Sequence, residues 1–169
     1  MALFVLALPG STYIYNGQEL GLPSGEMEDS DRQDPIYFRT KGKEKGRDGA
    51  RVPMPWNGNV APFGFTSGKP WLPLQESWRE FTVENELKDP DSSLNLYRKA
   101  LALRKERIMG SGEIEWLNTD GLLIYRRGEI TVMLNTTESS FPIEGEVLLA
   151  STKVDKEIPP RSSVWLVNN

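Results

Sequence analysis

The spacing of hydrophobic residues changes along the chain and marks segments with different expected structures. The chain opens with an unbroken apolar run over residues 2–8, which predicts a strand buried on both faces, as parallel sheets contain. A glycine-containing turn and Glu19 come after it, the order found where a barrel strand ends at its C-terminal face. From Gly112 onward apolar and polar residues alternate in short segments, which predicts an antiparallel β-sandwich. The expected strands are residues 113–117, 122–126, 129–134, 141–143, 147–150 and 164–167.

Before these strands, residues 92–107 have the spacing of an amphipathic helix. Asp91 or Ser92 is the expected N-cap, since both side chains can accept a hydrogen bond from the first turn. Apolar residues then recur at intervals of three and four and form one stripe, namely Leu94, Tyr97 and Leu101. The helix is therefore expected to pack on a sheet or strand.

Residues 21–69 show little periodicity and are rich in glycine, proline and charge. A loop of this length is usually either functional or disordered. Its many aromatic residues are unlike a disordered segment, so we expect an ordered excursion that builds a site. The following residues 71–84, which include Trp71 and Trp78, are expected to pack under this loop.

The densest group of candidate binding residues lies at residues 46–56, GRDGARVPMPW. Its prolines stiffen the backbone, Arg47 and Arg51 offer guanidinium donors, and Trp56 offers an aromatic face. Such a set suits a sugar, whose hydroxyls accept hydrogen bonds and whose ring stacks on an aromatic side chain. The arginines could equally pair with Asp48 and neighbouring acids in a purely structural loop, and the residues alone leave both interpretations open.

The composition excludes several classes of function. The 169 residues include 20 basic and 24 acidic ones, a net charge of −4, and no basic face that would bind nucleic acid is evident. The chain has no histidine and no cysteine, which removes Ser-His-Asp catalysis, disulfides and typical zinc sites. The carboxylates of residues 29–34 lack the glycine and glutamate of an EF-hand, so a solvated acidic turn is the better interpretation. We expect neither a metal nor a cofactor.

The apolar start of the chain also bears on location. It is too short for a transmembrane helix and lacks the basic region of a signal peptide, so we expect no membrane partner and a cytoplasmic protein. A single parallel strand needs neighbours, and the later sequence supplies no further β/α unit. We therefore expect the chain to be the C-terminal part of a larger protein.

Three motifs resemble the α-amylase superfamily, glycoside hydrolase family 13. Residues 8–21, with the pattern LPG-x-x-Y-x-Y-x-G-x-E-x-G, look like its eighth barrel strand. Residues 47–56, RDGxRVPxPW, followed by PFGF, resemble the loop after that strand in the α-glucosidase and oligo-1,6-glucosidase branch. Residues 89–106, DPxSxxxxYRxxxxLRxE, are similar to the eighth barrel helix.

The resemblance implies a fold class and a set of site residues. The chain would be an α+β fragment, with the last β/α unit of a (β/α)8 TIM barrel and its long loop in residues 1–110. Residues 111–169 would form the C-terminal antiparallel β-sandwich domain. In this branch the first arginine of the loop motif lies at the substrate-binding site, and that role maps onto Arg47. Asp48 and Arg51 match the motif as well, and Glu19 matches the acidic residue after strand eight, so these four are the candidate substrate-binding residues.

The resemblance also implies an activity, the hydrolysis of short α-linked glucosides by a retaining α-glucosidase, with an oligosaccharide as partner. Retaining glycosidases use a carboxylate nucleophile and a carboxylic acid, which this family carries after barrel strands four and five. A third acid follows strand seven in an Asn-His-Asp setting. The resemblance starts after strand seven and the chain has no histidine, so no catalytic residue is expected here and the chain alone is expected to be inactive.

Two other kinds of protein stay open. A non-catalytic relative, such as the ectodomain of an amino-acid transporter heavy chain, would act as an interaction domain, but the intact RDGxRVPxPW motif favours an enzyme. A stand-alone carbohydrate-binding β-domain is disfavoured because the aromatic residues gather before the expected sandwich. Finally, an apolar strand without neighbours predicts that the isolated chain self-associates through residues 2–15.

Overall fold

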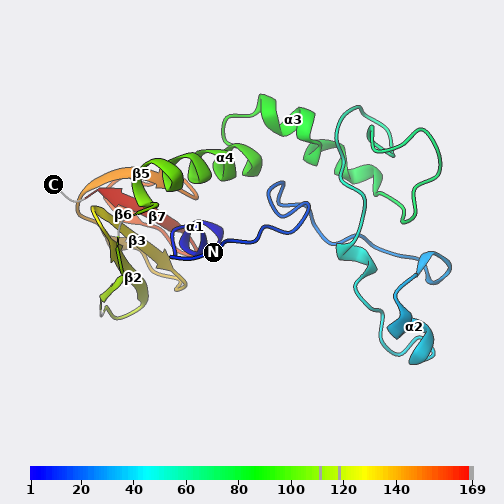
Figure 1. The fold of residues 1–169 in the computed structure, drawn as a ribbon, viewed down its shortest axis with the longest axis horizontal. Coiled ribbons are helices and arrows are strands. Elements are labelled where there is room, and N and C mark those ends of the chain that lie inside the picture. The colour runs from blue at the N-terminus through cyan, green and yellow to red at the C-terminus, as the bar shows by residue number, and fades with distance from the viewer. Residues whose placement is uncertain (111, 118, 168–169) are drawn as a thin grey trace. The chain divides into compact units, whose positions relative to one another are not determined.

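The computed structural model describes residues 1–110, 112–117 and 119–167, and Figure 1 traces them as a ribbon. The described residues form two compact units. One, the sheet unit, combines Met1–Tyr13 with the described part of Leu96–Asn169, and the other, the loop unit, is Ile14–Asn95. Residues 1–13 thus pack with the C-terminal strands. The domain boundary expected between residues 110 and 111 would separate the end of a TIM barrel from a β-sandwich domain, and it stays a prediction.

The described elements agree with an α+β fragment. The loop unit contains short helices only, which are η1 (Asp29–Asp31), α2 (Pro35–Arg39), η2 (Asp48–Ala50), η3 (Glu76–Phe81) and α3 (Val83–Lys88). Helix α4 (Ser93–Leu103) and the π-helical turn η4 (Arg104–Ile108) follow. The sheet unit also holds α1 (Ala2–Leu6), β1 (Glu115–Leu117), β2 (Leu122–Arg127), β3 (Ile130–Asn135), β4 (Phe141–Pro142), β5 (Glu146–Ala150), β6 (Glu157–Ile158) and β7 (Ser163–Val167).

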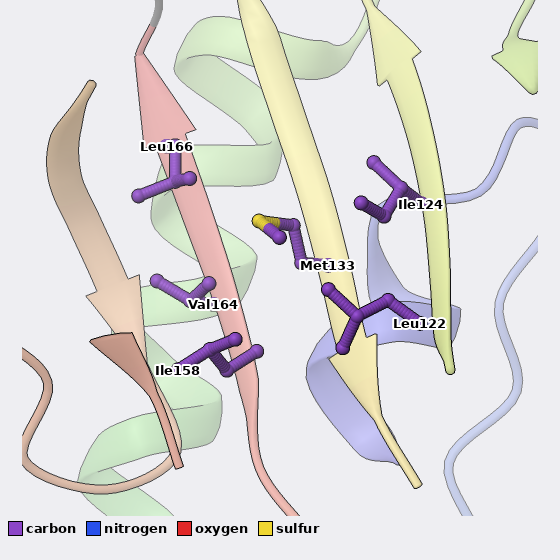
Figure 2. Packing of buried hydrophobic residues seen from close by; sticks show 6 residues of the cluster. All are labelled: Leu122, Ile124, Met133, Ile158, Val164 and Leu166. Atoms are coloured by element: carbon purple, nitrogen blue, oxygen red, sulfur yellow. The ribbon is translucent and has the colours of Figure 1, made fainter. Parts of the chain in front are cut away.

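Five strands form one antiparallel sheet in the order β1-β2-β3-β7-β5. The register pairs Ile124 with Met133 and Met133 with Val164, so these side chains share one face because neighbours in register point to the same side. Figure 2 shows this face, where Ile158 of β6 joins the residues from β2, β3 and β7. The short pair β4-β6 therefore contributes to the core on this side of the sheet.

The opposite face of the sheet lies against α1, which packs on β3 and β7. Tyr125, Val132 and Trp165 are in register there, and the Phe4 ring meets the Tyr125 ring edge-on with centroids 4.9 Å apart. Since both faces are covered, every residue of β3 is buried. Burial also raises the pKa of the Tyr125 hydroxyl.

The strand predicted for residues 2–8 is wrong, because residues 2–6 form helix α1 and Ala7 is its C-cap. A short apolar run does not separate a strand from a buried helix by its period. No parallel strand pairs with the run among the described residues, and its backbone bonds locally, with the Leu8 N–H donating to the Val5 carbonyl at 3.1 Å. Leu3, Phe4 and Leu6 are buried, so the expected exposed apolar strand is absent from the described residues.

Side chains of the sheet and of η4 hold α1 and the residues after it by their carbonyl oxygens. The Trp165 indole N–H donates to Leu3 at 3.0 Å and the Tyr125 hydroxyl to Phe4 at 2.6 Å. The remaining donors are two guanidinium groups: Arg127 donates to Ala7 at 3.1 Å, and Arg104 donates to Leu6, Leu8 and Gly10. Cations at the C-terminal end of a helix are favourable because the carbonyl groups there carry partial negative charge.

Several other elements confirm their predictions. The expected helix over residues 92–107 is present as α4 and η4, and the Ser92 hydroxyl caps it by accepting from the Asn95 N–H at 3.2 Å. The predicted strands correspond to β1–β5 and β7, whereas β6 has no counterpart in the prediction. The sandwich arrangement itself stays a prediction.

The core of the loop unit is built from residues far apart in sequence. Its buried members are Val52, Phe63, Leu74 and Trp78. Trp78 therefore packs under the loop as expected, whereas Trp71 is 76% exposed, contrary to the expectation for residues 71–84. Among the described residues, no helix has the length and apolar character needed to cross a membrane.

Candidate substrate-binding site

The motif of residues 46–56 folds back on the start of the loop unit at Gly49. The Gly25 N–H donates to the Gly49 carbonyl at 2.8 Å. A Cβ at Gly49 would lie 2.4 Å from the Gly25 oxygen, so no larger residue fits without a shift of the backbone. Glycine is required here by close approach of two backbone segments.

Asp48 is the buried anchor of the motif. Asp48 is only 2% exposed. Its Oδ2 accepts hydrogen bonds from the Gln33 and Asp34 N–H groups, both at 2.9 Å. A carboxylate that accepts two backbone hydrogen bonds fixes the position of both donors. Asp48 thus attaches the acidic turn to the motif and has a structural role inside this chain.

Asp34 forms the second link between these segments. Its Oδ1 accepts from the Ile36 N–H at 3.1 Å, which caps α2, and Oδ2 accepts from the Arg47 N–H and from the Arg51 Nη1, both at 3.0 Å. The hydrogen bonds from Ile36 and Arg47, with the charge of Arg51, hold the pKa of Asp34 below its usual value. The Asp34 backbone is extended before Pro35, as the residue before a proline usually is.

Because the backbone is held in this way, the two arginines of the motif differ. The Arg51 guanidinium is committed to Asp34 in an ion pair of 3.0 Å. The Arg47 guanidinium is exposed and makes no hydrogen bond or ion pair with any residue that the structure describes. It lines an open groove of about 560 Å³ with Asp34, Ile36, Arg39, Glu44, Lys45 and Gly46.

Glu19 lies in a different part of the loop unit. Its Oε2 is buried and has no hydrogen-bond partner among the described residues. The carboxylate is close enough to Glu86 for its charge to add to the burial that raises the pKa of Glu86. No hydrogen bond or ion pair joins Glu19 to Arg47, Asp48 or Arg51 among the described residues, so the structure brings together three of the four candidates.

Sequence reasoning missed Asp34 as a hub. The available signal was Asp-Pro, since an aspartate before proline at the first helical position is a typical N-cap. Its bonds to residues 47 and 51 are long-range and have no local pattern. The site can therefore position one uncommitted guanidinium on a backbone that buried carboxylates hold in place.

Comparisons with known proteins identify the family of this chain. Residues 1–112 match the sequence profile of the alpha-amylase catalytic domain. A probable alpha-glucosidase of Rhizobium meliloti is 39% identical over 125 residues, covering 73% of this chain and 22% of the relative. The oligo-1,6-glucosidase of Parageobacillus thermoglucosidasius is 33% identical over 145 residues, covering 75% of this chain and 26% of the relative.

Solved structures of related enzymes also superpose on nearly the full length of this chain. The crystal structure of XgtA, an alpha-glucosyl transfer enzyme, superposes with a TM-score of 0.81 at 30% identity and covers 99% of this chain and 35% of that one. The trehalose-6-phosphate hydrolase of Bacillus licheniformis superposes with a TM-score of 0.79 at 26% identity. The chain thus spans about a quarter of the length of the curated relatives that it matches.

Proposed function

Since this chain belongs to the α-amylase family of glycoside hydrolases, we propose that it forms the Arg47-bearing part of the substrate site of an α-glucosidase. The substrates are short α-linked glucosides of the maltose or isomaltose type. The observation that carries the proposal is the uncommitted guanidinium of Arg47 on a backbone that the buried carboxylates of Asp34 and Asp48 hold in place. A guanidinium has five N–H donors and no acceptor, which suits the hydroxyl oxygens of a sugar.

The four candidate residues then have different roles. Arg47 donates to substrate, whereas Asp48 and Arg51 act through the backbone that carries Arg47. Glu19 contributes a carboxylate from the residues after Gly17, with one oxygen free to accept a hydrogen bond. The nucleophile and general acid of the retaining mechanism lie outside this chain, as two carboxyl groups on either side of the scissile bond.

The names of the relatives support the choice of substrate. Two relatives are called probable alpha-glucosidase and oligo-1,6-glucosidase, while another, 30% identical, is the trehalose-6-phosphate hydrolase of Escherichia coli. We therefore propose a neutral glucoside with an α-linkage as the substrate class. A cytoplasmic location belongs to the same proposal, and cell fractionation tests it.

An exchange experiment tests the function. The part of the Rhizobium meliloti protein that matches this chain is replaced by this chain, and hydrolysis of p-nitrophenyl α-glucoside is measured. We expect the chimera to hydrolyse this substrate, and the 169-residue chain alone to release no p-nitrophenol above the buffer control. A folded chimera without activity would contradict the proposal and favour the non-catalytic interaction domain. Activity that purifies with the chain alone would contradict the assignment of the catalytic carboxyls.

A further inference from the structure

A groove of about 300 Å³ on the loop unit has chemistry that the proposed function does not use. Residues from the acidic turn, from the loop around Pro62 and from the stretch after Lys69 line it, and it shares no lining residue with the groove of Arg47. Its volume is at the lower end of the range for small-molecule sites. The residues that matter for the argument are Asp31, Gln33, Lys69, Trp71 and the neighbouring prolines.

Three polar side chains of this groove are uncommitted. The Asp31 carboxylate, the Lys69 ammonium and the Trp71 indole N–H make no hydrogen bond or ion pair with any described residue. Gln33 is fixed through its backbone N–H, which donates to the buried Asp48 at 2.9 Å, and its side-chain Nε2 donates to the Asp31 carbonyl oxygen at 3.4 Å. The groove therefore offers free donors and free acceptors side by side, which is the requirement of hydroxyl groups because each hydroxyl both donates and accepts.

The apolar part of the lining suits the same ligand. Trp71 is 76% exposed and has no ring contact among the described residues, so a flat indole face is open to solvent. Large exposed aromatic side chains beside polar groups are typical of recognition surfaces. The C–H face of a pyranose ring is a suitable partner for such a surface.

The lining is also held in place. Pro62, Pro70 and Pro73 restrict the backbone, and Leu74 belongs to the buried core of the loop unit. A site that is already ordered loses little entropy when a ligand binds. The single acidic and single basic side chain of the lining cancel in formal charge, which favours a neutral ligand over an ion.

We propose that this groove is a carbohydrate-binding site in its own right, which stacks one pyranose ring of a neutral α-linked gluco-oligosaccharide on Trp71 and binds its hydroxyls through Asp31, Gln33 and Lys69. The site deepens substrate recognition if the proposed function holds, but it does not depend on Arg47. A protein with both grooves would bind an oligosaccharide at separate places.

Nuclear magnetic resonance of the chain with maltotriose tests this proposal. We expect maltotriose to shift the Trp71 indole N–H signal with a Kd on the order of 1 mM, and the Arg47→Ala variant to show the same shift. Trp71→Ala is expected to weaken binding at this site about tenfold or more, and Asp31→Asn to weaken it less, since the amide keeps an acceptor without its charge. The matched control is Trp116→Ala, which removes another exposed tryptophan, 58% exposed, from β1 and should leave binding unchanged.

Several results would overturn the proposal. These are a Trp71 signal that does not move with maltotriose, equal binding by the wild-type and Trp71→Ala chains, or a shift caused by a proline-rich peptide and not by the sugar. If Arg47→Ala loses the shift while the other variants still bind maltotriose, the proposal is also overturned, because the sugar would then bind in the groove of Arg47. Circular dichroism of each variant tests whether the chain is folded. If Trp71→Ala does not fold, the binding of maltotriose by Asp31→Asn decides whether the groove is the site.

Discussion

At the scale of single residues, some buried carboxylates of the loop unit stabilise it, whereas the charge of another is costly. Asp34 and Asp48 are 6% and 2% exposed, and their oxygens accept from backbone N–H groups. Glu86 is 7% exposed, and burial, with the nearby charges of Asp89 and Glu19, raises its pKa although the Leu94 N–H donates to it. The same residue type is thus favourable or costly according to the donors that reach it.

The first prediction concerns Asp48. Asp48→Asn removes the charge that strengthens its two hydrogen bonds, and an amide nitrogen in the place of Oδ2 cannot accept from the Gln33 and Asp34 N–H groups. We expect the loop unit to lose about 1–3 kcal/mol of stability, measured by thermal and urea unfolding. Asp31→Asn is the matched control, because its carboxylate has no partner among the described residues. Equal stability of the two variants would show that Asp48 does not anchor the motif.

The second prediction uses the raised pKa of Glu86. Such a group stabilises the fold below its usual value of 4.5, and this contribution is lost as the pH rises through the folded-state pKa. Glu86→Gln keeps an acceptor for the Leu94 N–H without the charge. We therefore expect a higher Tm than wild type at pH 7, with the difference shrinking toward pH 4.

Glu84 of the same helix supplies the control for this experiment. The Gly58 N–H and Lys88 lower the pKa of Glu84, so Glu84→Gln should lower Tm at pH 7. A Glu86→Gln variant that is less stable than wild type at pH 7 would contradict the assigned cost of the Glu86 charge.

The candidate site could be located from sequence but not resolved into roles. The clustering of Arg47, Asp48 and Arg51 in a proline-stiffened stretch was visible, and the structure brings these three together. Which arginine is free depends on Asp34, 13 and 17 residues away from its partners. A pairing of this kind depends on the path of the loop in space, and no local pattern records it.

At the scale of elements, local patterns located β1–β5, β7 and α4, and missed β6 and α1. The hairpin β2-β3 follows from alternating apolar residues around Gly128, which has a positive φ of 59° as tight turns often require. Strand β6 has only two residues, too few for a period. Helix α1 depends on donors distant in sequence, such as Arg104, which is 96 residues from Leu8.

The third prediction tests this account of α1. Arg127→Ala leaves the buried Ala7 carbonyl without its donor, which costs about 1–3 kcal/mol. Hydrogen exchange at the Val5 and Leu8 amides should quicken by about tenfold or more, since 1.4 kcal/mol is a factor of ten. Arg126→Ala is the control, because this neighbour is exposed and bonds only to Glu115 at 3.4 Å among the described residues. Unchanged exchange in Arg127→Ala would contradict the role of Arg127.

At the scale of the whole molecule, self-association cannot proceed through an open apolar strand at residues 2–8, because residues 2–6 form helix α1. The apolar side chains of Leu3, Phe4 and Leu6 are buried within the sheet unit, and those of Val5, Tyr13 and Tyr15 are exposed. Self-association through residues 2–15 stays a prediction, now resting on these exposed side chains. Light scattering should show a dimer or larger species that Val5→Lys dissociates, and a strictly monomeric chain would contradict it.

The family assignment also belongs to this scale, because motifs spread over the chain pointed to it together. The profile match over residues 1–112 and the structural agreement over 99% of the chain confirm it. The wrong prediction for α1 did not affect the assignment, since the motifs that carry it lie outside this helix, at residues 8–21, 47–56 and 89–106.

The kcat/KM of the chimera with the Rhizobium meliloti protein tests most directly whether the free guanidinium of Arg47 binds the sugar. Arg47→Ala should lower kcat/KM for p-nitrophenyl α-glucoside by about tenfold or more, because a charged hydrogen bond contributes about 1.5–3 kcal/mol. Arg79→Ala, which removes another exposed arginine of the loop unit, should leave kcat/KM and Tm unchanged. Wild-type kcat/KM in the Arg47→Ala chimera would contradict the claim and leave Arg47 without a role in binding.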